Sequence, residues 1–120
     1  MRNWLLLSIL FISFSACTKK ANTDAFDTET WVADPDGCQL KRTEMIDQIY
    51  EVKQEVLGLH QKSILKVFGK PDEEELYERS QTYFIYAIDP SGDCETSADD
   101  PRKLYIRFTA LGIANEVNIK

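Results

Sequence analysis

The sequence has little of what histidine-, metal- or phosphate-dependent enzymes use. His60 is its one histidine, its three cysteines form no CxxC or CxH spacing, and its five glycines build no phosphate-binding loop. A serine or cysteine nucleophile needs a base within hydrogen-bond reach, and a zinc site needs grouped cysteine and histidine ligands. We therefore expect a protein that is not an enzyme and that uses no metal and no small-molecule cofactor.

Clustered positive charge is also missing. The 14 Lys and Arg residues stand against 20 Asp and Glu residues, which gives a formal net charge of -6. Binding to nucleic-acid phosphates needs a basic patch, and no Lys/Arg cluster interleaved with aromatic residues occurs in the chain. We expect no nucleic-acid partner.

No apolar run is long enough to cross a bilayer as a helix. The longest, residues 4–14, has about 11 residues, whereas a spanning helix needs roughly 20. Arg2 precedes this run and the small residues Ser15 and Ala16 follow it, which is the layout of a signal peptide. Residues 1–16 are therefore expected to direct export and to be removed.

Cys17 follows directly, and Ser15-Ala16-Cys17 resembles the lipobox of bacterial lipoproteins. That resemblance implies a diacylglycerol on the cysteine sulfur, cleavage before Cys17 and acylation of the new amino group. Phe14 departs from the aliphatic residue usual at its position, although the lipoboxes of Bacteroidetes are looser. The alternative is ordinary cleavage after Ser15 or Ala16, which would release the protein and leave Cys17 as an unpaired thiol.

The lipobox resemblance also implies a location. Three acyl chains exceed the two signals that stable membrane anchoring requires. Thr18, rather than Asp, follows the cysteine. Under general lipoprotein sorting rules, this favours the periplasmic leaflet of the outer membrane.

The mature chain is expected to have one domain. Residues 17–30 are polar and follow neither the helical nor the strand period, so we predict that they form a lipidated, flexible tether. Residues 31–120 then form a small domain, since this length suits one domain and not two.

Two further cysteines, Cys38 and Cys94, lie in this domain. An oxidising compartment favours pairing them, and closing such a loop would contribute roughly 4 kcal/mol in the chain-entropy model. A reactive thiol or a metal ligand is the alternative for either cysteine. Before Cys38, residues 34–37 read Asp-Pro-Asp-Gly, which predicts a turn; calcium binding would need further ligands at set spacings.

Helical periodicity follows the turn. In residues 40–57 four apolar side chains fall on one helical face, and Gly58 then ends the segment: Met45, Ile49, Val52 and Val56. A second helix is expected over residues 61–68, with His60 as its N-cap. The buried side of this helix is expected to be Ile64, Leu65 and Phe68.

After Pro71 the pattern changes to runs of aromatic and β-branched residues. These predict strands over 76–79, 82–88, 104–109 and 113–119, with residues 73–75 as an acidic, solvated turn. Residues 89–102 form a long loop that contains Cys94. The expected fold is α+β, with two N-terminal helices packed on one face of a three- to four-stranded antiparallel meander sheet.

The segment Gly58-Leu-His-Gln-Lys-Ser-Ile-Leu-Lys-Val-Phe-Gly-Lys-Pro-Asp72, followed by the meander, resembles the SmpA/OmlA/BamE group. These are small outer-membrane lipoproteins on the fold shared with β-lactamase inhibitor protein. The chain departs from the group in its Ala110-Leu111-Gly112 turn and in its Cys38/Cys94 pair. Five residues near the domain start also resemble the opening of an uncharacterised Bacteroidetes lipoprotein family: Trp31, Asp34, Gly37, Cys38 and Arg42.

The resemblance implies a non-enzymatic binding or scaffold module in outer-membrane protein assembly or envelope integrity, with an unknown envelope protein as partner. The candidate binding residues are Tyr83, Tyr86, Tyr105 and Arg107, because tyrosine and arginine suit such surfaces. Strand 82–88 would contribute one of its two alternating sets, either that of Tyr83 or that of Tyr86. Their alternative role is in the core or in cross-strand pairs. Two other functions stay open: inhibition of a periplasmic hydrolase through residues 89–101, and a small enzyme.

Overall fold

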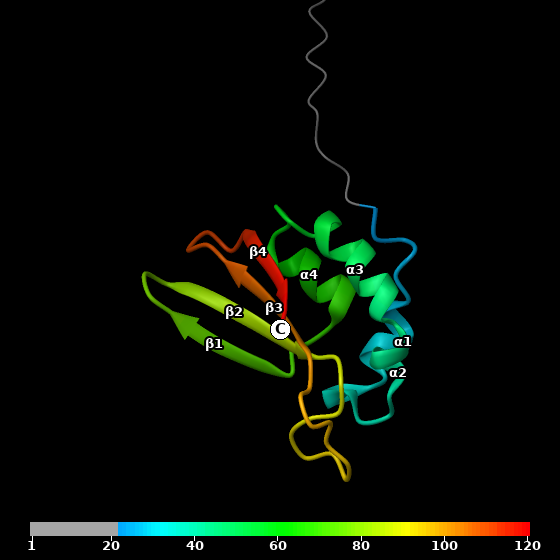
Figure 1. The fold of residues 1–120 in the computed structure, drawn as a ribbon. Helices are drawn as coiled ribbons and strands as arrows, with labels where there is room; N and C mark the ends of the chain where they lie inside the picture. Colours follow the sequence, from blue (N-terminus) through cyan, green and yellow to red (C-terminus); the bar gives the residue numbers. More distant parts are fainter. Residues whose placement is uncertain (1–21) are drawn as a thin grey trace, which may run out of the picture.

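Four strands form an antiparallel meander in the computed structural model, which describes residues 22–120. The sheet order is β1-β2-β3-β4, and the helices, which precede the strands, cover one face of it (Figure 1). The strands are β1 (Glu73–Tyr77), β2 (Gln81–Ala87), β3 (Lys103–Phe108) and β4 (Ala114–Ile119). The predicted α+β class and meander are therefore confirmed.

The helical layer has more pieces than the two helices predicted. It consists of α1 (Thr28–Val32), the 3-10 turn η1 (Pro35–Gly37), α2 (Lys41–Glu44), α3 (Ile46–Glu55) and α4 (Gln61–Phe68). Met45, with φ -88° and ψ 8°, divides the predicted 40–57 helix into α2 and α3. The apolar face of that segment is nevertheless confirmed, because its four predicted apolar residues are all buried.

Helix α4 has the predicted bounds, and Nδ1 of His60 caps it by accepting a hydrogen bond from the Lys62 backbone N–H at 3.1 Å. Its predicted buried side was wrong at Leu65, which is 41% exposed, whereas Val67 is buried with Ile64 and Phe68. The predicted set with Leu65 and the observed set with Val67 both form one stripe along a helix. The position of the sheet decides which of the two is buried.

Strand β1 corrects the expectation of an acidic turn over residues 73–75. Glu73, Glu74 and Glu75 pair with Ile85, Phe84 and Tyr83 of β2. All five residues of β1 are exposed, so the backbone joins the ladder while the carboxylates stay in water.

The packed body also begins earlier than the predicted domain start at residue 31. Phe26 is buried against Phe68 and Trp31, at ring-centroid distances of 5.0 and 5.6 Å. Asp27 caps α1 by accepting from the Thr30 backbone N–H. Residues 22–30 therefore pack on the domain, and the tether prediction was wrong for them, since one aromatic residue is enough to dock this polar segment.

Candidate functional site

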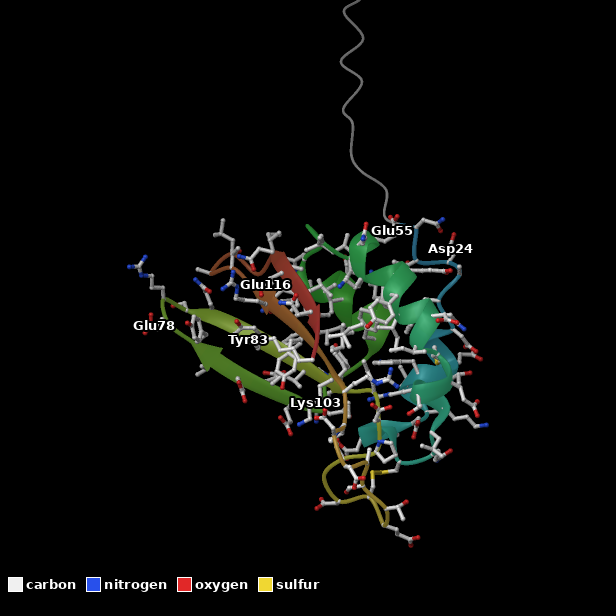
Figure 2. The ribbon with its side chains drawn as sticks, viewed as in Figure 1. Asp24, Glu55, Glu78, Tyr83, Lys103 and Glu116 are labelled. Carbon is white, nitrogen blue, oxygen red and sulfur yellow. A yellow bond between two sulfur atoms is a disulfide. The ribbon has the colours of Figure 1, made fainter. Side chains whose placement is uncertain are left out.

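Alternate side chains of the sheet point away from the helices and form its open face. The register sets Tyr83 opposite Arg107 and Ile85 opposite Tyr105, so these four residues share one face. No α-helix among residues 22–120 packs on this side, and Figure 2 shows Tyr83, Lys103 and Glu116 along it. The main polar and aromatic members of the open face are Glu73, Glu75, Tyr77, Tyr83, Lys103, Tyr105, Arg107, Glu116 and Asn118.

Three tyrosines run across the open face from β1 to β3. The ring of Tyr83 lies 5.8 Å from that of Tyr77 and 6.5 Å from that of Tyr105, in edge-to-face geometry at both contacts. Nζ of Lys120 lies 5.3 Å from the centre of the Tyr105 ring. Tyr77 is 52% exposed, while Tyr83 and Tyr105 are half-buried. The row offers aromatic edges and hydroxyl groups that can donate and accept hydrogen bonds.

Paired charges flank the tyrosine row. Nη2 of Arg107 lies 2.9 Å from Oε2 of Glu116, and its Nε donates to Oδ1 of Asn115 at 3.3 Å. Nζ of Lys103 lies 3.7 Å from Oε1 of Glu73. Exposed pairs of this kind contribute little to stability, so a partner can compete for them at low cost.

Tyr86 does not belong to the open face, and its inclusion among the candidate binding residues was wrong. Its side chain points to the helices, is fully buried, and donates a hydrogen bond to the Gly69 carbonyl oxygen at 2.8 Å. Burial, followed by the nearby Asp72 carboxylate, raises the pKa of the Tyr86 hydroxyl. Tyr83 and Tyr86 lie three residues apart on one strand, so they cannot share a face.

Tyr77 is a face residue that the sequence analysis missed. It lay within a predicted strand, but which of two alternating sets faces outward depends on strand pairing. The pairing of Tyr77 with Gln81 puts it on the same side as Tyr83. Only the register of the hairpin supplies that information.

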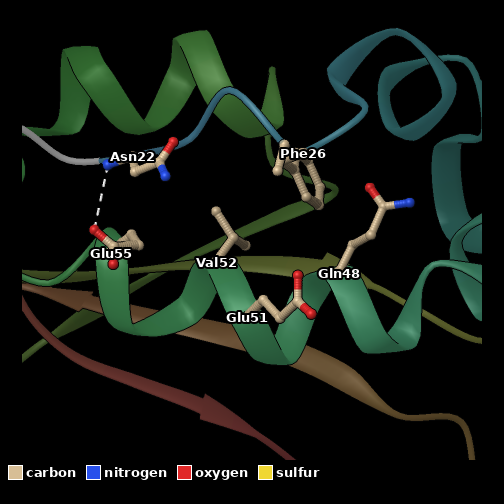
Figure 3. Close-up of a pocket in the computed structure, with 7 residues that line it drawn as sticks. Asn22, Phe26, Gln48, Glu51, Val52 and Glu55 are labelled. Atoms are coloured by element: carbon tan, nitrogen blue, oxygen red, sulfur yellow. Dashed lines mark hydrogen bonds between the residues drawn. The ribbon is translucent and has the colours of Figure 1, made fainter.

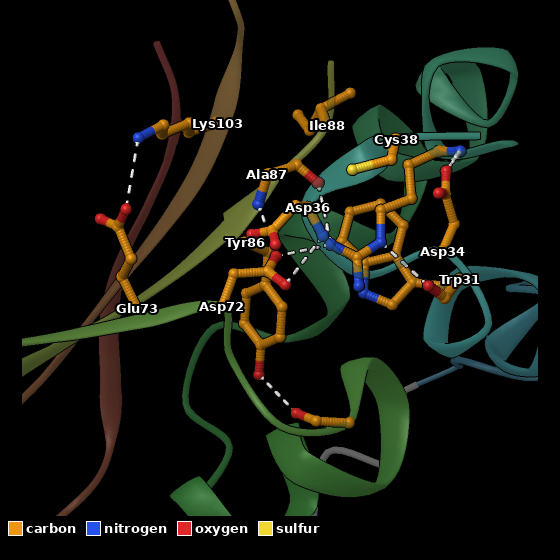
Figure 4. A network of polar contacts seen from close by, with 12 residues as sticks. Trp31, Asp34, Asp36, Cys38, Asp72, Glu73, Tyr86, Ala87, Ile88 and Lys103 are labelled. Carbon is orange, nitrogen blue, oxygen red and sulfur yellow. Dashed lines mark hydrogen bonds and ion pairs between the residues drawn. The ribbon is translucent and has the colours of Figure 1, made fainter. Parts of the chain in front are cut away.

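The residues of the Bacteroidetes-like opening come together, but on the buried side. Arg42, 2% exposed, stacks 4.4 Å over the Trp31 ring and donates from Nε to the Trp31 carbonyl oxygen at 2.9 Å. Figure 4 shows Trp31 and Asp34 beside Asp72 and Ala87 in this network. Both carboxylate oxygens of Asp34 accept backbone N–H groups, from Gln39 on one side and from Lys41 and Arg42 on the other. These contacts hold the helical segments to one another, and Nη1 of Arg42 joins them to the sheet by donating to the Ala87 carbonyl oxygen at 3.0 Å, which is a structural role.

A disulfide joins Cys38 and Cys94 across 56 residues. The predicted pairing is therefore present in the structure, and it ties the loop between β2 and β3 to η1. At the base of this loop, Oδ2 of Asp89 accepts from Nε of Arg102 at 2.7 Å and from the Arg102 backbone N–H at 2.9 Å. Cys17, the predicted lipidation site, lies outside the described residues.

A shallow cleft lies where the first described residues cross α3. It has a volume of about 170 Å³ and is lined in part by Phe26, Gln48 and Glu51 (Figure 3). The backbone N–H of Asn22 donates to Oε2 of Glu55 at 3.2 Å at one end of it. Its small size and its shallow, acidic lining make it a weaker candidate than the open face.

Two kinds of feature are absent from residues 22–120. No group of three or more His, Cys, Asp or Glu side chains is arranged to hold a metal ion in this part of the chain. No helix among these residues is both long and apolar enough to cross a membrane.

No family model and no curated protein matches the chain. The chain is similar to a solved structure described as that of an osmotically inducible lipoprotein, OsmE, with 16% identity and a TM-score of 0.39. The match covers 52% of this chain and 64% of that chain, which is less than two thirds of its length. A similarity this weak carries no argument about function, so the resemblance to the SmpA/OmlA/BamE group stays a prediction.

Proposed function

We propose that this chain is a membrane-anchored envelope lipoprotein whose domain is a non-enzymatic binding or scaffold module. Cys17 carries the lipid anchor on the periplasmic side of the outer membrane, and the open face of the sheet contacts a protein partner. Outer-membrane protein assembly or envelope integrity is the process in which such a module would act.

The observation that carries the proposal is the tyrosine row of Tyr77, Tyr83 and Tyr105 on a sheet face without a helical cover. Tyrosine and arginine are enriched at protein interfaces, because each combines apolar area with hydrogen-bonding groups. Arg107 lies opposite Tyr83 and adds a planar donor beside the row. The edge-to-face contacts hold the rings in place before binding, which lowers the ordering cost of association.

The anchor is tested by the mass of the protein purified from membranes of a bacterial host. We expect three acyl chains on Cys17 and palmitate labelling of the wild-type chain. Cys17→Ser removes the attachment site, so it should abolish labelling and release the protein from the membrane fraction. An unlabelled wild-type protein would contradict the proposed anchoring.

The open face is tested by photocrosslinking in intact cells. A benzophenone amino acid replaces Tyr77 or Tyr105 on the open face, or Tyr50 on α3 as a matched control, since Tyr50 is also about half exposed. We expect one discrete envelope protein to be crosslinked from both sheet positions and not from Tyr50. Equal crosslinking from all three positions, or none from the sheet, would exclude the open face as the contact surface.

A second candidate function is inhibition of a periplasmic hydrolase, and the loop of residues 89–101 supports it. The disulfide and the Asp89–Arg102 pair hold the loop, while most side chains of residues 92–100 are exposed. A loop ordered before binding suits insertion into an enzyme cleft. The same photocrosslinker at Thr96 distinguishes the two functions, because capture of one soluble hydrolase there, and not from Tyr105, would favour inhibition.

A further inference from the structure

The described chain begins beside the end of α3, close to the β3–β4 hairpin. Asn22 is bonded to Glu55, at the last turn of α3. The loop that follows α3 is bonded to the β3–β4 hairpin, because Gly58 N–H donates to the Ala114 carbonyl oxygen at 2.8 Å. Gln61 N–H donates to the Gly112 carbonyl oxygen at 2.9 Å, which adds a second bond between these segments.

The β1–β2 turn lies at the same end. One row across the sheet runs from Ala114 through Phe108 and Thr82 to Leu76. We call this the hairpin end: Asn22 and residues 57–60, 76–80 and 109–113. Figure 1 shows the two hairpin turns at the upper left and the start of the described chain at the top right of the domain, whereas η1, α2 and the long β2–β3 loop lie toward the bottom.

The hairpin end also carries exposed leucines. Leu76 is 88% exposed and Leu111 is 84% exposed, the two highest values among large apolar residues within 22–120. Leu57, at 41%, lies in the adjoining loop. A single exposed leucine is ordinary, but these three lie in or beside the loops at one end of the sheet, and several exposed apolar residues on one side mark a contact with a partner or a membrane.

The short segment between Cys17 and Asn22 favours the membrane over a protein partner as the contact of these leucines. Asn22 is held on α3 and Phe26 is buried, so residues 22–26 cannot lengthen a tether. Five peptide steps separate Cys17 from Asn22, and they can span at most about 18 Å. A lipid on Cys17 therefore holds Asn22 within roughly that distance of the bilayer, and it brings the bonded end of α3 and the β3–β4 hairpin close to the membrane.

We infer that the hairpin end faces the membrane and that Leu57, Leu76 and Leu111 contact its lipid surface. This rests on the proposed acylation of Cys17. Because the strands run toward this end, the sheet stands upright on the bilayer. The open face is then perpendicular to the membrane surface, so a protein partner beside this domain can reach the tyrosine row.

The charges at this end indicate the kind of contact. Asp24 and Glu55 lie close to where the described chain begins (Figure 2), and both disfavour a strongly anionic surface. In the β1–β2 turn the charges of Glu78 and Arg79 offset each other, and Lys62, in the first turn of α4, is a basic residue beside the loop of residues 57–60. The contact is therefore apolar, and it should persist on phosphatidylcholine alone and change little with salt.

Tryptophan quenching by lipid tests this inference. The lipidated protein is purified in detergent and reconstituted into phosphatidylcholine vesicles with brominated acyl chains, which quench tryptophan on contact. Trp31, the native tryptophan of the domain, is fully buried and gives a constant background. Leu76→Trp and Leu111→Trp report on the hairpin end, and Leu40→Trp, 51% exposed at the opposite end, is the matched control.

We expect a blue shift and strong quenching for Leu76→Trp and Leu111→Trp, at low and high salt, and neither for Leu40→Trp. Flotation of the same vesicles and the protein mass report on the anchor separately. If the Leu76→Trp and Leu111→Trp proteins are acylated and float, but their fluorescence matches that of the control, the membrane-facing orientation is overturned and the proposed function stays intact. Protein without acyl chains overturns both.

Discussion

Arg42 and Asp72 form a buried ion pair that joins the helical layer to the sheet. Nη1 of Arg42 lies 2.6 Å from Oδ2 of Asp72, and the two side chains are 2% and 9% exposed. Oδ2 of Asp72 also accepts from the Ala87 backbone N–H at 2.8 Å, and Oδ1 accepts from the Asp36 backbone N–H at 3.1 Å. One carboxylate thus holds α2, η1 and β2 at the start of β1.

We predict that Asp72→Ala lowers the free energy of unfolding by about 3–5 kcal/mol, because it leaves a buried guanidinium without its counter-charge. Urea unfolding followed by circular dichroism measures the loss. Glu75→Ala, on exposed β1, is the control and should change stability by less than about 0.5 kcal/mol. A small loss for Asp72→Ala would mean that Arg42 reaches water.

Removing the disulfide should lower the stability of the protein without preventing it from folding. We expect Cys38→Ala/Cys94→Ala to lower the free energy of unfolding by about 2–4 kcal/mol, since the loop it closes in the unfolded chain is long. Thermal unfolding without reductant measures the difference from wild type. Reductant should bring the wild type down to the variant, and a wild type that is insensitive to reductant would contradict the role of the disulfide.

Asp89 should make stability depend on pH in the acid range. The hydrogen bond from Arg102 lowers the pKa of Asp89 to about 2. A carboxyl whose pKa is depressed in the folded state adds stability above its unfolded pKa, near 3.9, and this is lost as the pH falls toward 2. Because Arg102 is partly exposed, we expect the free energy of unfolding to fall by only about 1–2 kcal/mol when Asp89 is protonated.

Asp89→Asn tests that assignment. Urea unfolding at a series of pH values between 5 and about 2 should show a weaker decline for the variant than for the wild type. Asp99→Asn, in the exposed part of the same loop, is the matched control and should follow the wild-type curve. Identical curves for Asp89→Asn and wild type would remove Asp89 as the titrating group.

Asp36 offers a substitution that should stabilise the protein. Desolvation by burial, with the Asp72 carboxylate next, raises the pKa of the Asp36 carboxyl, so the negative charge of Asp36 is less well stabilised in the folded state than in water. Its φ of 59° lies in the left-handed region that asparagine adopts readily. We expect Asp36→Asn to raise the free energy of unfolding by roughly 0.5–1 kcal/mol at pH 7, measured by urea unfolding. A loss of stability would show that the negative charge is needed there.

The local elements were largely predictable from residue patterns. Apolar spacing, the His60 cap and the Gly69 stop defined α4, because these signals act within a few residues of one another. The strands over 82–88, 104–109 and 113–119 followed from alternation to within a residue or two. The patterns failed where distant contacts decide. Residues 22–30 pack on the domain because Phe26 contacts Phe68 and Trp31. Strand β1 begins at Glu73, three residues before the predicted strand, because residues 73–75 pair with β2.

In the candidate site, too, the residue pattern predicted some features and distant contacts decided the others. Alternation within β2 separates Tyr83 from Tyr86, but it cannot say which of them is buried. That choice depends on which face of the sheet the helices cover, and so on contacts such as Tyr86 with Gly69.

Composition and short-range spacing alone determined the small α+β class, the signal-like start and the cysteine pair available for a disulfide. Tertiary structure alone decided which tyrosines face outward, that Arg42 and Asp72 pair, and that Asn22 lies at the hairpin end. The reason is physical: helix caps, turns and periodicity depend on neighbours in the chain, whereas the facing and register of a strand depend on residues that only folding brings close.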